Sequence, residues 1–364
     1  MHPILVTGAS GKTGNAVARQ LLEAGHSVRA FVHRHDERSD ALKLLGADVV
    51  VADLFDTGGL RAAMDGTKRA YFALPVHPHA LQIGAAFAIA ASEARLEAIV
   101  GMTQWLASPT HPAAHTRQSW LTDRVLAMVP GAAHVVVNPG YFADNYLSPM
   151  LLRTAAHLGI YPYPFGDSKN APPSNDDIAR IAVACLLDPE THAGRAYRPA
   201  GPELVGGREI AAALTRVFER PVHAIDLPWW LFAKALRVSG FDRNFQMNIR
   251  QYVADHKAGA FAFAAASGDV ERLTGRAAES FETIARRYAS DPSLRPTIAN
   301  RLRAIAEFAV LPMIPAYDLE RYARRIQFVA PRQPELAMDN GQWLAERLAR
   351  ATPEHASTIE AAAA

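Results

Sequence analysis

Three glycines near the start of the chain constrain its fold more than any other feature. Gly8, Gly11 and Gly14 follow a short apolar run, residues 3–7, and lead into a stretch with helical periodicity, residues 13–24. The first glycine permits a tight turn out of a strand, the second leaves room for phosphates at the backbone, and the third lets the helix pack closely on the strand. The free amide groups at the helix start then favour an anion.

This turn predicts a site for the pyrophosphate of a dinucleotide. The residues expected to contact it are Gly8, Ala9, Ser10, Gly11, Lys12, Thr13 and Gly14. A glycine triplet alone is a weak signal, but this one stands between a strand and a helix and ahead of a further series of the same kind. We therefore favour a cofactor site over a plain glycine-rich turn.

Apolar runs alternate with helical stretches, such as residues 114–129, through the first half of the chain. The expected strands are residues 3–7, 27–32, 47–52, 69–73, 97–102 and 134–138. Runs such as Val-Val-Val at 49–51 and at 135–137 predict strands that are buried on both faces. The alternation predicts an α/β fold with a doubly wound parallel Rossmann sheet.

Composition argues against a disordered, nucleic-acid-binding, disulfide-bonded or membrane-spanning protein. The formal net charge is +2, hydrophobic residues make up 49% and charged residues 20%, so we expect a folded core and no binding to nucleic acid. The single cysteine, Cys185, cannot form a disulfide within the chain. We find no unbroken apolar run of roughly 20 residues and no signal-like start, so we expect a cytoplasmic protein without a membrane span.

The end of the second expected strand distinguishes the two nicotinamide cofactors. An acidic residue there would bind the ribose 2′-hydroxyl of NAD, but the sequence continues with His33 and Arg34. Arg34, with Lys12, would instead pair with the 2′-phosphate of NADP, unless both are solvated surface cations. Asp53, followed by Leu54, is a candidate contact to adenine, or it simply begins a turn. We expect NADP(H) to be preferred, with NAD(H) as the alternative.

With these motifs in place, the chain resembles the NmrA-like branch of the atypical short-chain dehydrogenases/reductases. The resemblance covers residues 1 to about 290 and rests on segments 7–14, 52–56, 138–145, 176–179, 201–203 and 273–276. It implies a Rossmann domain and a smaller substrate domain that enclose the nicotinamide. The positions that it implies near the nicotinamide are Leu74, Pro75, Met102, Thr103, Pro139, Gly140 and Phe142.

The expected domains follow from this comparison. Residues 1–155, with roughly 176–195, would form the NADP-binding Rossmann domain, and residues 156–175 and 196–290 a smaller α/β substrate domain. Residues 161–166, Tyr-Pro-Tyr-Pro-Phe-Gly, are expected as a loop or short edge strand. Residues 291–364 would form a helical C-terminal extension, to which we assign no role.

The catalytic pair of ordinary short-chain reductases is missing. In the resemblance, Thr116 and Trp120 stand where a tyrosine and a lysine would be. One hypothesis is a reductase of quinone-like acceptors, which need little acid from the protein, with Thr103 and His115 as nearby polar groups and His77 as a further candidate. The alternative is a non-catalytic sensor of the NADP redox state that regulates a protein partner; a structural protein is a third option.

Two further groups of residues remain ambiguous. Paired histidines, such as His77 with His79, lack cysteine support, so we expect no metal site. The aromatic residues Trp229, Trp230 and Phe232 would line a substrate pocket or, more commonly, fill a core. The sequence fixes neither the substrate nor the oligomeric state, for which monomer and homodimer both remain open.

Overall fold

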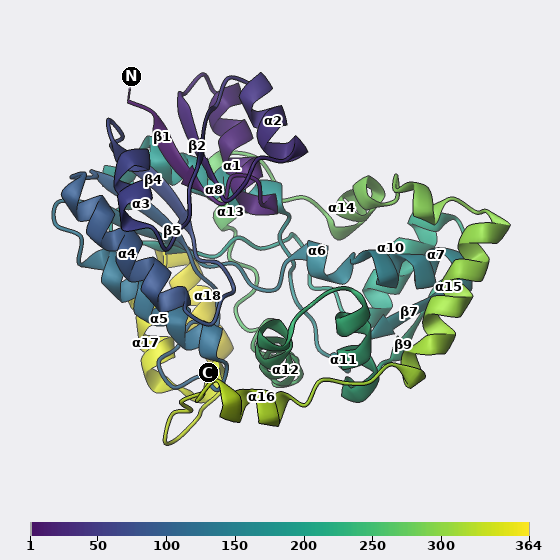
Figure 1. Ribbon diagram of the computed structural model, residues 1–364. Helices are drawn as coiled ribbons and strands as arrows, with labels where there is room; N and C mark the ends of the chain where they lie inside the picture. Colours follow the sequence, from purple (N-terminus) through teal and green to yellow (C-terminus); the bar gives the residue numbers. More distant parts are fainter. Residues whose placement is uncertain (1, 364) are drawn as a thin grey trace.

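The structure, a computed structural model, describes residues 2–363 and is built on a seven-stranded parallel sheet (Figure 1). The strands are β1 (Ile4–Thr7), β2 (Val28–Val32), β3 (Asp48–Val51), β4 (Arg69–Ala73), β5 (Ala98–Met102), β6 (Ala133–Val137) and β8 (Ala196–Tyr197). Their spatial order is β3-β2-β1-β4-β5-β6-β8. The order reverses between β1 and β4, and open α/β sheets bind ligands at the carboxyl ends of strands beside such a reversal. The predicted Rossmann sheet is confirmed.

Helices cover both faces of this sheet, as the doubly wound prediction requires. One face carries α1 (Lys12–Glu23), α2 (Glu37–Leu44), α8 (Asn175–Leu187) and α13 (Asp269–Thr274), and the other carries α3 (Thr57–Met64), α4 (Ala80–Glu93) and α5 (Ala114–Ala127). A short helix, α9 (Pro189–His192), joins α8 to β8. Val17, Leu21 and Ile178 are buried on the first face, and Phe87 and Leu126 on the second.

Burial of the strands follows their place in the sheet. Val135, Val136 and Val137 of β6 are fully buried, as their continuous apolar run predicts. The same prediction is wrong for Val49–Val51. Strand β3 lies at the edge of the sheet, so Val51 remains 43% exposed. Three consecutive valines therefore indicate a strand here, but not whether a neighbour covers it.

A second, smaller group of elements lies beyond the carboxyl edge of the sheet. It contains α6 (Ala143–Tyr146), α7 (Pro149–Leu158), β7 (Ile160–Tyr163), α10 (Gly207–Phe218), β9 (His223–Asp226), α11 (Trp229–Val238), α12 (Arg243–Lys257) and α14 (Phe281–Tyr288). Strand β7 pairs with β9 in a two-stranded parallel sheet, so the segment at 161–166 begins as a strand. Pro162 is tolerated in it because both strands of such a sheet are edges.

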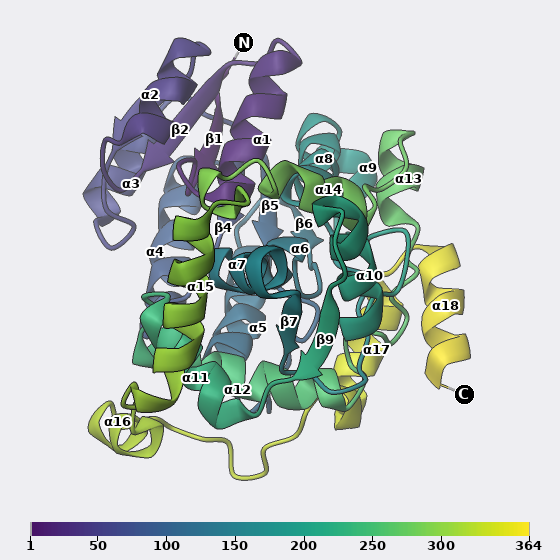
Figure 2. The same ribbon diagram turned by 90° about the vertical axis from the view of Figure 1, so that its right-hand side faces the viewer.

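The last part of the chain wraps from this second group back to the main sheet. Figures 1 and 2 show α15 (Ile298–Val310) beside α7, α16 (Leu319–Arg325) near α12, and α17 (Gly341–Arg350) and α18 (Pro353–Ala363) on the Rossmann side. Arg153 pairs with Glu307 at 2.8 Å and fastens α15 to α7. Arg350 pairs with Asp123 at 2.7 Å and fastens α17 to α5. The residues after 290 are thus helical, as expected, and are packed at both ends.

Within residues 2–363, no helix is both long enough and apolar enough to cross a membrane.

Candidate cofactor and substrate site

The glycine turn has the geometry that a dinucleotide site needs. Gly8 leaves β1 with a φ of +61°, in the left-handed region, and its carbonyl oxygen accepts a hydrogen bond from the Gly11 amide at 2.8 Å. A Cβ on Gly14 would come within 2.3 Å of the Gly8 oxygen, so only glycine fits there. The turn is therefore closed around its own backbone, and helix α1 lies against the end of β1.

The start of α1 is free to bind an anion. Gly11 is its N-cap residue and offers no side-chain hydrogen bond to the helix amides, and the first turn contains no acidic residue. Gly8, Gly11 and Lys12 are exposed, Ser10 is half-buried, and Ala9 is buried. Unsatisfied amides at a helix N-terminus fit a pyrophosphate. The residues present therefore fit the phosphates of a dinucleotide.

Two side chains of the turn are already engaged. The Thr13 hydroxyl donates to Asn175 Oδ1 at 3.0 Å, which ties α1 to the start of α8. Lys12 Nζ lies 2.8 Å from Asp144 Oδ2 of α6 and 5.8 Å from the centre of the Tyr288 ring of α14. The ammonium group thus bridges the glycine turn and the second group of elements.

The expected adenosine contacts lie at the ends of β2 and β3. Arg34 is exposed, and among residues 2–363 it has no ion pair. Asp53 accepts a hydrogen bond from the Phe55 amide at 2.9 Å and so shapes the turn after β3, while Leu54 is half-buried beside it. The turn-forming role of Asp53 is thus visible, and its contact with adenine stays a prediction.

The expected nicotinamide contacts follow β4, β5 and β6 at the same edge of the sheet. Leu74 and Pro139 are buried, whereas Pro75, Thr103 and Phe142 are half-buried. The Thr103 amide donates to the Val137 oxygen at 2.9 Å and the Trp105 amide to the Pro139 oxygen at 2.9 Å. These bonds hold the loop after β5 against the loop after β6.

The predicted polar groups Thr103 and His115 are not joined by a hydrogen bond in the described structure. His115 is buried at the start of α5, where burial lowers the pKa of its ring to about 4, and its Nδ1 has no partner within residues 2–363. Its backbone amide donates to Asn248 Oδ1 of α12 at 2.9 Å. Burial therefore keeps the His115 ring neutral, and the backbone amide of His115, not its ring, makes the hydrogen bond to α12.

A cluster of three polar side chains, Gln104, Thr116 and Tyr252, stands directly after Thr103. The Tyr252 hydroxyl of α12 donates to Gln104 Oε1 at 2.8 Å. The Thr116 hydroxyl lies 3.2 Å from the same oxygen and 3.3 Å from the Tyr252 hydroxyl. Burial raises the pKa of Tyr252 to about 12, although the hydrogen bonds with Thr116 and Gln104 act to lower it. The phenol therefore keeps its proton.

Sequence reasoning missed Tyr252. The second group of elements brings a phenol to Thr116 from 136 positions further along the chain. A buried hydrogen bond helps to hold α12 in place, because His111 Nε2 of the loop before α5 lies 2.8 Å from Asp255 Oδ2 of α12. No local motif announces such a contact, since it exists only after α12 packs on α5.

The remaining histidine candidate, His77, lies on the loop after β4. Its ring Nδ1 accepts a hydrogen bond from the His79 amide at 3.1 Å and its edge meets Phe55 at 5.1 Å between ring centres. Burial lowers the pKa of His77, and the Asp242 carboxylate at the start of α12 opposes this. In the part of the chain that the structure describes, no three His, Cys, Asp or Glu side chains form a metal-binding group.

The C-terminal helices brace the loop that carries Thr103 and Gln104. Trp343 of α17 is 1% exposed, donates from Nε1 to the Trp105 oxygen at 2.9 Å and packs edge-on against the Trp105 ring. Arg347 donates to the Ala107 oxygen at 3.0 Å. Helix α17 therefore holds residues 104–108 in place, although no pattern in the sequence connects this helix with the site.

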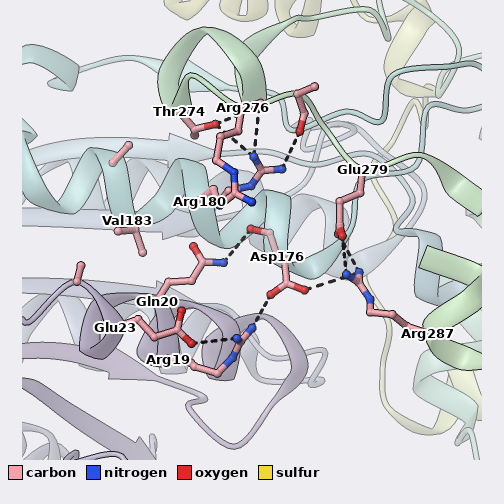
Figure 3. A pocket seen from close by; sticks show the side chains of 13 residues that line it. Arg19, Gln20, Glu23, Asp176, Arg180, Val183, Thr274, Arg276, Glu279 and Arg287 are labelled. Carbon is pink, nitrogen blue, oxygen red and sulfur yellow. Dashed lines mark hydrogen bonds and ion pairs between the residues drawn. The ribbon is translucent and has the colours of Figure 1, made fainter. Parts of the chain in front are cut away.

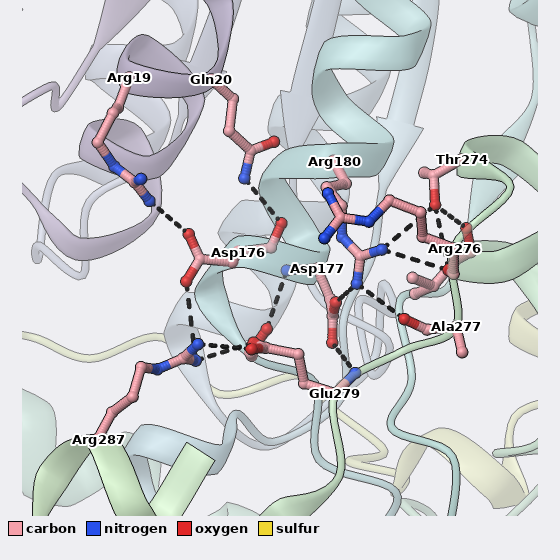
Figure 4. Close-up of polar contacts among 12 residues, drawn as sticks. Arg19, Gln20, Asp176, Asp177, Arg180, Thr274, Arg276, Ala277, Glu279 and Arg287 are labelled. Atoms are coloured by element: carbon pink, nitrogen blue, oxygen red, sulfur yellow. Dashed lines mark hydrogen bonds and ion pairs between the residues drawn. The ribbon is translucent and has the colours of Figure 1, made fainter. Parts of the chain in front are cut away.

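A charged pocket of about 680 Å³ lies away from this edge, between α1, α8 and the segment from α13 to α14 (Figures 3 and 4). Three of its four arginines are neutralised by carboxylates. Arg19 pairs with Asp176 at 2.7 Å, Arg180 pairs with the buried Asp177, and Arg287 pairs with Glu279 at 2.5 Å. The network links the cofactor helix to α8 and α14, and its internal pairing leaves little charge for a ligand.

Comparison with known proteins agrees with this geometry. Residues 8–189 match a family described as NAD(P)H-binding. The NAD(P)H azoreductase of Xenophilus azovorans is 30% identical over 292 residues, which cover 79% of this chain and 98% of that protein. About a fifth of this chain thus has no counterpart in that relative.

Two solved structures share the fold. An NADPH-dependent quinone oxidoreductase from Escherichia coli, complexed with NADPH, superposes with a TM-score of 0.68 at 22% identity and covers 78% of this chain and 99% of its own. NmrA, a negative transcriptional regulator in complex with NAD, gives a TM-score of 0.65 at 16% identity over 78% of this chain and 94% of its own. The predicted nicotinamide cofactor is confirmed, and the fold agrees with the predicted resemblance: the chain belongs to the NAD(P)H-binding family.

Proposed function

We propose that this protein is an NADPH-dependent reductase that passes a hydride to a small conjugated acceptor of the quinone or azo type. The observation that carries the proposal is the hydroxyl cluster of Gln104, Thr116 and Tyr252, which follows Thr103 at the end of β5. The cluster supports the proposal because it brings a protonated phenol to Thr116, the residue that the resemblance aligns with the tyrosine of ordinary short-chain reductases. The azoreductase and quinone oxidoreductase relatives support the same class of acceptor.

The choice of NADPH over NADH rests on charge. Arg34 is exposed at the end of β2 and has no carboxylate partner in the described structure, whereas Lys12 is paired with Asp144. A guanidinium in this place binds a 2′-phosphate with two parallel hydrogen bonds. Lys12 is then better placed to steady the pyrophosphate turn than to select the cofactor.

The chain's own residues supply what such a reaction needs beyond the hydride. The glycine turn would hold the pyrophosphate of the cofactor, and the bound nicotinamide would supply two electrons and one proton as hydride. A quinone becomes a hydroquinone by gaining that hydride and one further proton. We assign this proton to the Tyr252 phenol, which donates to Gln104 Oε1 and accepts a hydrogen bond from the Thr116 hydroxyl, so that both neighbours hold the phenol oxygen in place. An electron-poor acceptor needs no lysine to lower the pKa of the phenol.

The test replaces Tyr252 by phenylalanine and follows NADPH consumption with a quinone and an azo acceptor. We expect kcat to fall by roughly a hundredfold, the lower end of the range for loss of a general acid, with little change in NADPH binding. The matched control is Tyr197→Phe, which should keep full activity. It removes a phenol of β8 that is hydrogen-bonded to His192 of α9. If Tyr252→Phe keeps the wild-type rate, water supplies the proton. If no acceptor is reduced by the wild type, the reductase proposal fails.

A second function, that of a redox sensor acting on a protein partner, is favoured by one surface feature. Ile298, Leu302 and Ile305 form one stripe along α15 and are 81%, 61% and 45% exposed. Exposed apolar stripes of this kind mark contact surfaces. A sensor would bind NADPH without consuming it and would bind its partner with an affinity that changes between NADP⁺ and NADPH. A partner affinity that ignores the cofactor, or is unchanged in Leu302→Glu, excludes this function.

A further inference from the structure

The C-terminal extension forms a second pocket that is rich in unpaired arginines. It has a volume of about 540 Å³ and is lined by residues of α11, α12 and α16. Figure 2 shows these three helices near one another. Four guanidinium groups line it, from Arg237 of α11, Arg243 of α12, and Arg321 and Arg325 of α16. They come from three helices, and two of the four belong to the part of the chain after residue 290.

The charge of this pocket is not neutralised. In the structure from residue 2 to 363, none of these four arginines forms an ion pair with a carboxylate. The one carboxylate in the lining, Asp318, accepts a hydrogen bond from the Arg321 amide at 2.8 Å and caps α16. The contrast with the pocket of Figures 3 and 4 is direct, because there carboxylates hold three of four arginines.

The pocket is also shaped, which distinguishes it from scattered surface arginines. The Arg237 guanidinium donates to the Pro315 oxygen at 2.6 Å and lies 4.5 Å from the centre of the Tyr317 ring. The Arg243 guanidinium lies 5.0 Å from the same ring. Tyr317 thus holds two cations side by side against their mutual repulsion through cation–π contacts. Arg321 and Arg325 are one helical turn apart and face the same pocket.

We propose that this pocket binds the phosphate or sulfonate group of a small organic anion. Several guanidinium groups converging on one concave site match an oxyanion with three acceptor oxygens, and they do so better than ammonium groups would. A single carboxylate has fewer oxygens than four guanidinium groups can bind. The assignment rests on the arginines and stands apart from the proposed hydride transfer.

The location suits a role beside the reductase site. Tyr252 follows Arg243 by nine positions on α12, which corresponds to about 14 Å along the helix axis. Asp242, the neighbour of Arg243, is close enough to His77 on the loop after β4 to oppose the lowering of the His77 pKa by burial, so this end of α12 lies near that loop. An anion held here would lie at the N-terminal end of the helix that carries the phenol in its second half.

The test is a calorimetric titration of the full-length protein with pyrophosphate at low ionic strength, with and without saturating NADP⁺. NADP⁺ occupies the glycine turn, so pyrophosphate that still binds reports on the arginine pocket. We expect one such site, weakened about tenfold by Arg321→Gln and further by the double variant with Arg325→Gln. Arg324→Gln, an exposed arginine of the same helix outside the pocket, is the matched control and should bind as the wild type.

The outcomes separate this proposal from the proposed function. No binding, or binding that the double variant leaves unchanged, overturns the anion site even if the protein reduces quinones. Binding that the double variant removes supports it even if no acceptor is reduced. A paired assay then identifies the source of the anion. If the double variant raises KM for a sulfonated azo acceptor but not for its unsulfonated analogue, the group belongs to the acceptor. If it changes neither, the anion is a separate small molecule.

Discussion

Replacing Gly14 by alanine tests the glycine turn most sharply. The added Cβ would stand 2.3 Å from the Gly8 oxygen, 2.7 Å from the Gly8 carbonyl carbon and 2.9 Å from the Thr7 oxygen. These are backbone atoms of β1 and the turn, so no side chain can swing aside. An ordinary contact needs about 3.4 Å, and α1 must therefore retreat from the sheet by about 1 Å.

That retreat has two measurable consequences. Overpacking of this kind costs about 1–3 kcal/mol of unfolding free energy, which urea denaturation will show. It also moves the free amides of α1 away from the pyrophosphate, and a shift of this size at hydrogen-bonding groups should weaken NADPH binding by at least about tenfold. Calorimetric titration of the folded variant measures the second effect separately from the first.

A matched substitution supplies the control. Gly341 begins α17, and a Cβ there meets nothing within 4 Å, so Gly341→Ala should change neither stability nor binding by more than about 0.5 kcal/mol. Gly14→Ala with wild-type affinity for NADPH would refute the placement of the cofactor on this turn. Wild-type stability in the same variant would refute the close packing of α1 on β1.

Three further predictions address the cofactor, the extension and the buried histidines. Arg34→Ala should raise the Kd for NADPH about tenfold and leave that for NADH unchanged; equal effects on both would remove Arg34 from the 2′-phosphate. Trp343→Ala should lower the unfolding free energy by about 3–5 kcal/mol in urea, whereas Trp230→Ala, at a side chain that is 51% exposed, should cost under about 0.5 kcal/mol. Burial lowers the pKa of His256 to about 3, so the folded state keeps this ring neutral while the unfolded state protonates near pH 6.5. The contribution of the neutral ring to the free energy of unfolding is therefore complete above pH 6.5 and falls by about 1.4 kcal/mol per pH unit below it. His256→Gln should flatten the fall of the free energy of unfolding between pH 6.5 and 5, and the exposed control His223→Gln should not. An unchanged slope in His256→Gln would contradict this.

The parts of the fold that follow from local patterns were predictable. The strand, glycine turn and helix at residues 3–24 are specified by neighbouring residues, because strand burial and helix periodicity are short-range properties. The same holds for the other central strands. Edge position is different: residues 49–51 are apolar in the sequence, yet β3 has a neighbour on one side only.

The parts that depend on distant contacts were not predictable from one sequence. Tyr252 reaches Thr116 and Gln104 only because α12 packs on α5, and Trp343 reaches Trp105 only because the extension returns to the main sheet. In both cases the partners are more than 130 positions apart. The pattern of each helix predicts its apolar face, but nothing in it identifies the surface that this face will cover.

The most direct test of the account is a single-turnover experiment without oxygen, in which the protein saturated with NADPH is mixed with a quinone or azo acceptor. The absorbance of the reduced nicotinamide reports the reaction. The account predicts that one NADPH is oxidised for each two-electron reduction of the acceptor, at a rate that Tyr252→Phe lowers. Tight NADPH binding with no oxidation by any acceptor of this class would contradict it and leave the protein as a sensor of its cofactor.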